Sequence, residues 1–195
     1  YNTFKSQCEP LLMRYASPDF ECVILRPSTV CGYSPRQRLD LAVNILTNLA
    51  YNTGRIIVYG GAQKRPNIHI ADLVRCYRLL LEAPASLVAG QVFNVGAGNL
   101  TIMELAERVR SMVGTFCERP IEIEVRPIED VRSYQVNSDK IARTLGFFPN
   151  HSISSAVLDL CEAFAAGVLP NSMEDDRYYN VRTMKRVFAD LYGGE

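Results

Sequence analysis

The sequence predicts an α/β fold. Short apolar runs such as residues 21–27 (ECVILRP) and 92–95 (VFNV) have the composition of buried strands. Between them lie longer segments whose apolar residues recur every three or four positions, as on one face of a helix. Strands that alternate with helices along a chain indicate this class, and 195 residues are enough for one core or for one and a half small ones.

In the first part of the chain, Pro18, Gly54 and Pro84 mark the expected helix ends. The predicted elements, in order, are a helix over 1–15 with an apolar stripe, a strand over 21–27, a loop over 28–35, a helix over 41–49, strands over 56–59 and 67–70, and a helix over 72–81 capped by Asp72. The stripe of the first helix consists of Cys8, Leu11, Leu12 and Tyr15.

In the second part, Thr101 and Glu104 have the spacing of a capping box, which predicts a helix start. The predicted elements are a strand over 92–95, a helix over 101–113, a strand over 121–125, a helix to Leu145 capped by Asn137 or Ser138, a helix from Ser152 or Ser154, and an amphipathic stretch over 181–191.

Charge and composition narrow the possible partners. The 21 basic and 21 acidic residues give a formal net charge of zero, so neither nucleic acid nor an anionic membrane is expected as a partner. No apolar run approaches bilayer-spanning length, and no signal peptide is visible. Six cysteines without a CxxC pair and only two histidines argue against a metal site. We therefore expect a cytoplasmic protein with reduced thiols and no metal.

The chain opens on Tyr1-Asn2-Thr3-Phe4-Lys5, a YxxxK pair. On a helix, residues i and i+4 share a face. An ammonium group beside a phenol favours the phenolate and lowers its pKa from about 10, which suits proton exchange with a sugar hydroxyl. The spacing alone is a weak signal, because such pairs also occur by chance on helix surfaces.

The YxxxK helix, the apolar strand and the LRPSTVxGxSPR segment together resemble the extended short-chain dehydrogenase/reductase family, and more narrowly its nucleotide-sugar epimerases and dehydratases. Residues 93–96 (FNVG) match the same family. The resemblance implies that Tyr1 is the catalytic acid/base and that Lys5 holds the nicotinamide ribose of NAD or NADP and lowers the pKa of Tyr1. It also implies that the backbone of Pro27 borders the nicotinamide.

The resemblance extends to candidate substrate contacts after this strand. Thr29 stands where many family members have a substrate-binding asparagine, and a threonine can still donate one hydroxyl hydrogen bond. This difference leaves the sugar open. Arg36 and Arg38 resemble residues of a subset of bacterial nucleotide-sugar epimerases, which implies a substrate role. The alternative is that both arginines are solvated in a turn before a helix.

Residues 65–73 (RPNIHIADL) resemble the family's R-D-x-x-H-V-x-D segment. A guanidinium fork binds pyrophosphate oxygens in a bidentate manner, so Arg65 is expected to contact the substrate diphosphate. The alternative is an exposed arginine on a turn. We expect His69 to be a hydrogen-bonded structural residue on a strand, and Asp72 to be a helix cap rather than a base.

Residues 126–149 resemble a second family segment, R-P-G-D-V-R followed by L-G-x-x-P, in which an arginine contacts the diphosphate. Here Ile128 and Glu129 replace the glycine, so the phosphate arginine is Arg126 or Arg132, with a slight preference for Arg132. A solvated arginine beside Asp130 is the alternative. Arg65 and Arg132 are expected to converge on one cleft, on the side of Tyr1.

In the resembling family a glycine-rich dinucleotide turn precedes the YxxxK pair, and these 195 residues contain none. We therefore interpret the chain as the C-terminal part of an enzyme, with the end of a Rossmann-type parallel sheet and a smaller mixed α/β substrate-binding domain. Residues 1–38 and 85–98 are assigned to the NAD-binding domain, and residues 39–84 and 99–195 to the substrate-binding domain. Its expected partners are the missing N-terminal half, a nucleoside-diphosphate sugar and, when complete, a second subunit in a homodimer.

The predicted function is an NAD(P)-dependent epimerase or dehydratase acting on a nucleoside-diphosphate sugar. A sugar-nucleotide ketoreductase shares the same residues. A non-catalytic nucleotide-binding member of the family is a rival from another class, although intact Tyr1 and Lys5 argue against it. A third alternative is that these 195 residues are an inactive fragment of the enzyme.

Overall fold

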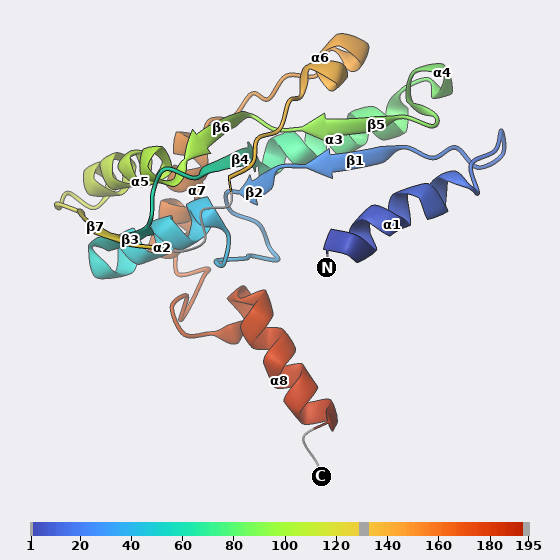
Figure 1. The fold of residues 1–195 in the computed structure, drawn as a ribbon. Helices are drawn as coiled ribbons and strands as arrows, with labels where there is room; N and C mark the ends of the chain where they lie inside the picture. Colours follow the sequence, from blue (N-terminus) through green and yellow to red (C-terminus); the bar gives the residue numbers. More distant parts are fainter. Residues whose placement is uncertain (1, 129–132, 193–195) are drawn as a thin grey trace.

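The computed structural model describes residues 2–128 and 133–192 and has mixed α/β architecture (Figure 1). Its helices are α1 (Asn2–Met13), α2 (Ala42–Thr53), α3 (Ile70–Glu82), α4 (Ala85–Val88), α5 (Ile102–Phe116), α6 (Asp139–Leu145), α7 (Ile153–Ala165), the 3-10 turn η1 (Asp176–Tyr178) and α8 (Asn180–Tyr192). Its strands are β1 (Ile24–Pro27), β2 (Thr29–Cys31), β3 (Arg55–Tyr59), β4 (Lys64–His69), β5 (Val92–Val95), β6 (Gly98–Thr101) and β7 (Glu122–Arg126).

The described strands form three small sheets. β1 and β5 pair in parallel, and β3 and β7 form a second parallel pair. In the third sheet, β4 lies between β2, to which it is parallel, and β6, to which it is antiparallel. The prediction that strands 21–27 and 92–95 belong to one parallel sheet is confirmed. The first strand is shorter than predicted, because its partner begins only at Val92, after a turn at Gly90.

Two strands differ from the prediction. β2 lies within residues 28–35, which are predicted to be a loop, and β6 has no counterpart among the predicted strands. β2 has two β-branched residues but is only three residues long, and β6 begins at a glycine, so neither has a run long enough to identify it locally. Both form by pairing with β4, with Thr29 opposite Asn67 and Asn67 opposite Gly98. Tertiary pairing with β4 therefore creates these two strands.

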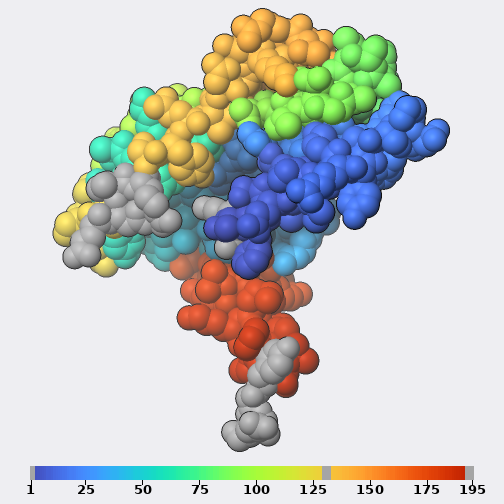
Figure 2. Space-filling model, turned by 45° about the vertical axis from the view of Figure 1, so that its right-hand side comes forward, coloured from blue at the N-terminus to red at the C-terminus, as the bar shows by residue number. Residues whose placement is uncertain are grey.

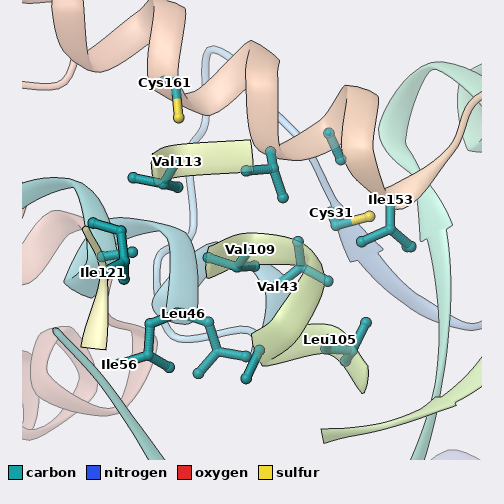
Figure 3. Packing of buried hydrophobic residues seen from close by; sticks show 14 of the residues in the cluster. Cys31, Val43, Leu46, Ile56, Leu105, Val109, Val113, Ile121, Ile153 and Cys161 are labelled. Carbon is teal, nitrogen blue, oxygen red and sulfur yellow. The ribbon is translucent and has the colours of Figure 1, made fainter. Parts of the chain in front are cut away.

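Two hydrophobic clusters hold the sheets and helices together. The first packs α2, α5 and α7 against β3, and Figure 3 shows its side chains pointing toward one another. The second joins β5 with α3 and α6 through buried residues that include Leu73, Cys76, Phe93, Ile141 and Phe147. The amphipathic faces that the sequence predicts for these helices are therefore buried against the sheets.

Several helix boundaries agree with the local signals. Thr101 and Glu104 form the predicted capping box, with Thr101 Oγ1 accepting from Glu104 N at 3.1 Å and Glu104 Oε2 accepting from Thr101 N at 2.7 Å. Ser152 caps α7 by accepting from Ser155 N at 3.1 Å. α2 ends where predicted, because Gly54 adopts a left-handed conformation with φ of 71°.

The predicted cap of α3 is wrong. His69 occupies the N-cap, and its Nδ1 accepts from Ala71 N at 3.1 Å. Asp72 lies inside the first turn, is fully buried, and accepts from the backbone N–H groups of Asn150 at 3.0 Å and His151 at 2.8 Å. Arg75 Nη2 also donates to it at 3.0 Å. Asp72 therefore fastens the segment before α7 onto α3.

His69 has the structural role that the sequence predicts. Because its Nδ1 accepts a hydrogen bond, its Nε2 carries the proton and donates to Asp159 Oδ2 at 3.0 Å. Its ring also stacks on His151 with centroids 4.6 Å apart. These contacts join the end of β4 to α7.

α1 and α8 lie at the periphery of the molecule. α1 runs beside β1 with its N-terminal end toward β2, and α8 projects from the body (Figures 1 and 2). α1 ends at Met13, two residues earlier than predicted, and its predicted apolar stripe is exposed: Cys8, Leu11, Leu12 and Tyr15 all face solvent. Within residues 2–128 and 133–192, no helix has the length and apolarity needed to cross a bilayer.

We predict that Asp72→Asn destabilises the fold. Burial acts to raise the pKa of Asp72, but the hydrogen bonds from Asn150, His151 and Arg75 outweigh it and lower the pKa to about 2. An amide supplies fewer acceptors to these donors, so the free energy of unfolding should fall by about 2–4 kcal/mol in urea denaturation. The exposed Asp19→Asn is the matched control, and equal stability of the two variants would contradict this prediction.

We also predict that His69 makes stability depend on pH. Burial lowers the pKa of His69, and the nearby Asp159 carboxylate only partly offsets this. The unfolded chain therefore takes up a proton near pH 6.5, whereas the folded protein does so only at lower pH. Stability should decrease as the pH falls below about 7 toward the lowered pKa. His69→Gln keeps a side-chain N–H but does not titrate. The unfolding free energy of this variant should therefore lose the pH dependence due to His69 between about pH 8 and 5. An unchanged pH dependence would show that His69 does not cause it.

Candidate active site

The carboxyl ends of β1 and β5 define the candidate site. Pro27 and Val95 are the last residues of the paired strands and lie opposite each other. Ser28 N donates to Val95 O at 2.8 Å, and the chain then enters β2 at Thr29. Ligands of open α/β sheets bind beyond the carboxyl ends of parallel strands. Pro27 and Thr29 therefore stand at the edge where a cofactor and a substrate are expected.

Two buried polar atoms at this edge lack partners. Ser28 Oγ and Asn67 Oδ1 have no hydrogen bond within the described part of the chain, although both residues are buried. Asn67 lies opposite Thr29 in the register of β2 and β4. A buried polar atom without a partner is unfavourable, so the edge retains hydrogen-bonding capacity for a polar ligand group.

Lys5 lies on α1, toward the same edge. Glu9, one helical turn later, accepts from Arg26 Nε at 2.8 Å, and this hydrogen bond lowers the pKa of the Glu9 carboxyl. Arg26 directly precedes Pro27, and α1 runs back along β1 (Figure 1). Lys5 is therefore about 6 Å farther along the helix axis than Glu9, toward the carboxyl end of β1. Tyr1 lies outside the described residues.

Arg65 lies on β4 and is half-buried. Its guanidinium lies over the Tyr134 ring, 5.2 Å from the centroid, and its Nη1 donates to Lys64 O at 2.9 Å. Ser133 Oγ accepts from Lys64 N at 2.9 Å, so the segment that starts at Ser133 runs along β4. Arg132, the preferred partner of Arg65, lies outside the described residues.

Arg126 is the last residue of β7 and lies opposite Tyr59. Its exposed side chain donates from Nε to Glu124 Oε1 at 2.7 Å, which raises the pKa of Arg126 and lowers that of Glu124. A phosphate that binds Arg126 would compete with this carboxylate. Arg126 and Arg132 both remain candidates for the second diphosphate contact.

Arg36 and Arg38 contact protein groups. Arg36 donates to Gln37 O and Arg177 O, both at 3.3 Å, and to Asn180 Oδ1 at 3.4 Å. Arg38 forms a bidentate pair with Asp40, at 2.9 and 3.1 Å. The proximity of the C-terminal segment to this loop was not predicted, because the partners are about 140 residues apart and carry no local signal.

A cavity of about 470 Å³ lies beside this loop. Its wall is shared between the loop after β2 and the segment that leads from α7 into α8, and it is lined by Tyr33, Pro35, Arg36, Gln37, Val168, Leu169, Pro170, Arg177, Tyr178 and Thr183. The sequence contained no signal for it, since the two walls come from opposite ends of the chain.

Burial excludes three thiols from nucleophilic chemistry. Burial raises the pKa of Cys31 and Cys161 to about 12, and that of Cys76 to about 11. The thiolate is the nucleophilic form of cysteine, so these side chains remain protonated and inert near neutral pH.

Comparison with known proteins identifies a family whose sequences resemble this chain. The NAD dependent epimerase/dehydratase family model matches residues 1–96. A dTDP-glucose 4,6-dehydratase of Shigella flexneri is 29% identical over 145 residues, which are 69% of this chain and 39% of that protein. The chain therefore spans well under two thirds of this relative.

Solved structures share the fold. The dTDP-glucose 4,6-dehydratase from Bacillus anthracis in complex with NAD has a TM-score of 0.67 and 17% identity, over 93% of this chain and 54% of that one. The UDP-glucose 4-epimerase from Thermotoga maritima with UDP-glucose has a TM-score of 0.68 and 23% identity, over 86% of this chain and 54% of that one. The expected Rossmann-like α/β class is thereby confirmed. In sequence and in fold, the chain is therefore similar to members of the NAD-dependent epimerase/dehydratase family.

Proposed function

We propose that the complete protein containing this chain is an NAD(P)-dependent epimerase or dehydratase acting on a nucleoside-diphosphate sugar. The observation that carries the proposal is Lys5 of the YxxxK sequence, which lies on α1 toward the carboxyl edge of β1 and β5, where Pro27 and Thr29 are found. The relative from Shigella flexneri is a dTDP-glucose 4,6-dehydratase, and the structure from Thermotoga maritima holds UDP-glucose, which supports the substrate class.

The residues at this edge fit the nicotinamide end of NAD. They offer the Lys5 ammonium, the backbone at Pro27 and the unpartnered Ser28 hydroxyl. Since the glycine-rich pyrophosphate turn is absent from the 195 residues, we assign that turn to preceding polypeptide. When bound, NAD or NADP supplies the acceptor and donor of a hydride at the sugar carbon.

The chain's own residues then have distinct roles. Tyr1, as the phenolate, takes a proton from the sugar hydroxyl, and the Lys5 ammonium stabilises the phenolate. Thr29 donates a hydrogen bond to the sugar. Arg65, together with Arg126 or Arg132, holds the diphosphate, so that binding energy far from the reacting carbon orients the sugar.

The proposed division into domains follows from these roles. The pair β1 and β5 with α1, within residues 1–38 and 85–98, contributes to the NAD-binding domain, and residues 39–84 and 99–195 form the substrate-binding domain. In the complete, cytoplasmic enzyme we assign the uncovered face of α1 to the missing half or to the second subunit of a homodimer.

We predict that Tyr1→Phe abolishes turnover of the complete enzyme, because the phenyl ring cannot accept a proton. Turnover is measured as product formed from UDP-glucose or dTDP-glucose, because the hydride returns to the sugar and leaves no net change in cofactor absorbance. Binding of the sugar nucleotide should be largely retained. The exposed Tyr15→Phe is the matched control. Lys5→Met should weaken cofactor binding and move the rate profile to higher pH, because the phenolate loses its neighbouring cation. Near-normal kcat in Tyr1→Phe would refute the acid/base assignment.

We predict that Arg65→Ala weakens sugar-nucleotide binding by about 1–3 kcal/mol, the range for hydrogen bonds to charged groups. Calorimetry with UDP or dTDP should show the same loss, and the loss should shrink at high salt. The exposed Arg78→Ala, on α3, is the matched control. Comparing Arg126→Ala with Arg132→Ala then identifies the second phosphate contact. Competition by free glucose but not by UDP would exclude a nucleotide-sugar substrate.

A further inference from the structure

The loop after β2 is held by a segment from the other end of the chain. Leu39 N donates to Tyr178 O at 2.9 Å, and Asn180 N donates to Asp40 Oδ2 at 3.0 Å. Arg36 adds its two hydrogen bonds to Arg177 O and Asn180 Oδ1. Residues 177–180 thus contact the loop at three positions, through backbone and side-chain groups alike.

Apolar packing reinforces these hydrogen bonds. The Leu39 side chain is completely buried in a cluster with Leu160, Leu169, Tyr178 and Tyr179. Because its backbone N–H and its side chain both engage residues 178–179, displacing this segment would leave an unpaired N–H and expose a leucine. The conformation of the loop therefore depends on the C-terminal segment.

The C-terminal segment is itself anchored independently of the loop. Asn48, on α2, donates from Nδ2 to Ser172 O and to Tyr179 Oη, both at 3.1 Å. Tyr179 Oη donates to Ser172 O at 2.8 Å. All three side chains are buried, so residues 172–179 have a fixed position on α2 and can serve as a rigid support.

The cavity of about 470 Å³ lies where the loop and this support meet. Tyr33, Arg36 and Gln37 line one wall and Arg177 and Tyr178 the other. The hydrogen-bond acceptors of Arg36 are two carbonyl oxygens and one amide oxygen, all neutral, so its charge is available to an anionic or hydroxyl-rich ligand. The shape of this cavity is set by the contacts between the two walls.

We propose that residues 177–180 are the positioning element of the loop over residues 33–40, and that through this loop they set the affinity for the sugar nucleotide. The second part rests on the proposed function. Asn180 is a positioning residue: its backbone N–H orients Asp40, which in turn holds Arg38, and its side chain orients Arg36. A ligand that meets a loop already held in place does not have to order it on binding.

The experiment compares Asn180→Ala with Asn180→Asp in the complete protein. Alanine removes the acceptor for Arg36, whereas aspartate keeps an acceptor oxygen. Hydrogen exchange of the peptide that contains Leu39 reports the loop directly and needs no ligand. It should accelerate by up to about tenfold in Asn180→Ala, the effect of losing one hydrogen bond, and stay near the wild-type rate in Asn180→Asp.

Binding is measured in parallel with UDP-glucose, dTDP-glucose and NAD. The sugar-nucleotide Kd should rise by up to about tenfold in Asn180→Ala, with the NAD Kd unchanged. The double variant Asn180→Ala/Asp40→Asn weakens both side-chain links and should show larger changes. Lys185→Ala, an exposed position on the same helix, is the control and should behave like the wild type in every measurement.

Each part of the proposal can be overturned separately. Unchanged exchange at Leu39 in both the single and the double variant would show that residues 177–180 do not position the loop. Faster exchange with unchanged sugar-nucleotide Kd would show that the loop does not set affinity. If the wild-type protein binds neither sugar nucleotide, the proposed function and the affinity part are both refuted, while the exchange result still judges the positioning contact.

Discussion

The close approach of Ser28 and Gly96 constrains the edge where the paired strands β1 and β5 end. A methyl group added at Gly96 would lie 2.2 Å from Ser28 Oγ, so the hydroxyl would have to move, and 3.2 Å from Ser28 Cβ, which is a tight contact. At this point the paired strands β1 and β5 end, and their chains continue into β2 and β6, which flank β4 on either side. A larger residue at position 96 would therefore displace the Ser28 hydroxyl, which lies at the edge that carries the candidate site.

A buried polar cluster around Asp72 and His69 lies at the end of β4 and the start of α3. A buried carboxylate is stable only when donors surround it, and Asp72 has donors from two backbone N–H groups and one guanidinium. His69 extends the cluster to Asp159 on α7. These contacts fix the start of α7, whose apolar face completes the first hydrophobic cluster and whose end leads into the segment that holds the loop after β2. The histidine and aspartate of this motif therefore have structural roles, joining the end of β4 and α3 to α7 and to the segment before it.

The sequence predicts structural features that depend on neighbouring residues. It fails for features that depend on contacts between distant segments. Thr101 with Glu104, Ser152 and Gly54 act within one helical turn, so the helix ends they specify were predicted correctly. The strands β2 and β6 exist only because β4 lies between them. The predicted cap of α3 is wrong because Asp72 accepts hydrogen bonds from backbone groups almost 80 residues away, and no local pattern reveals such partners. The family motif proposes Lys5, Thr29 and Arg65 as site residues, whereas the contact of Arg36 with residues 177–180 has no counterpart in any local pattern.

The contacts of α1 bear on the proposed role of Lys5. Within the described residues, the hydrogen-bonded ion pair between Glu9 and Arg26 is exposed, and such pairs contribute about 1 kcal/mol or less. The helix has 12 residues and contains Pro10, so its intrinsic stability is low, while Phe4 is 74% exposed. In the same part of the chain, β1 has a partner strand on one edge only. Productive proton transfer requires groups held in a defined geometry, and a helix supported this weakly does not provide it. If Lys5 acts as proposed, further contacts to α1 and to the second edge of β1 would be needed to hold its side chain in a defined geometry.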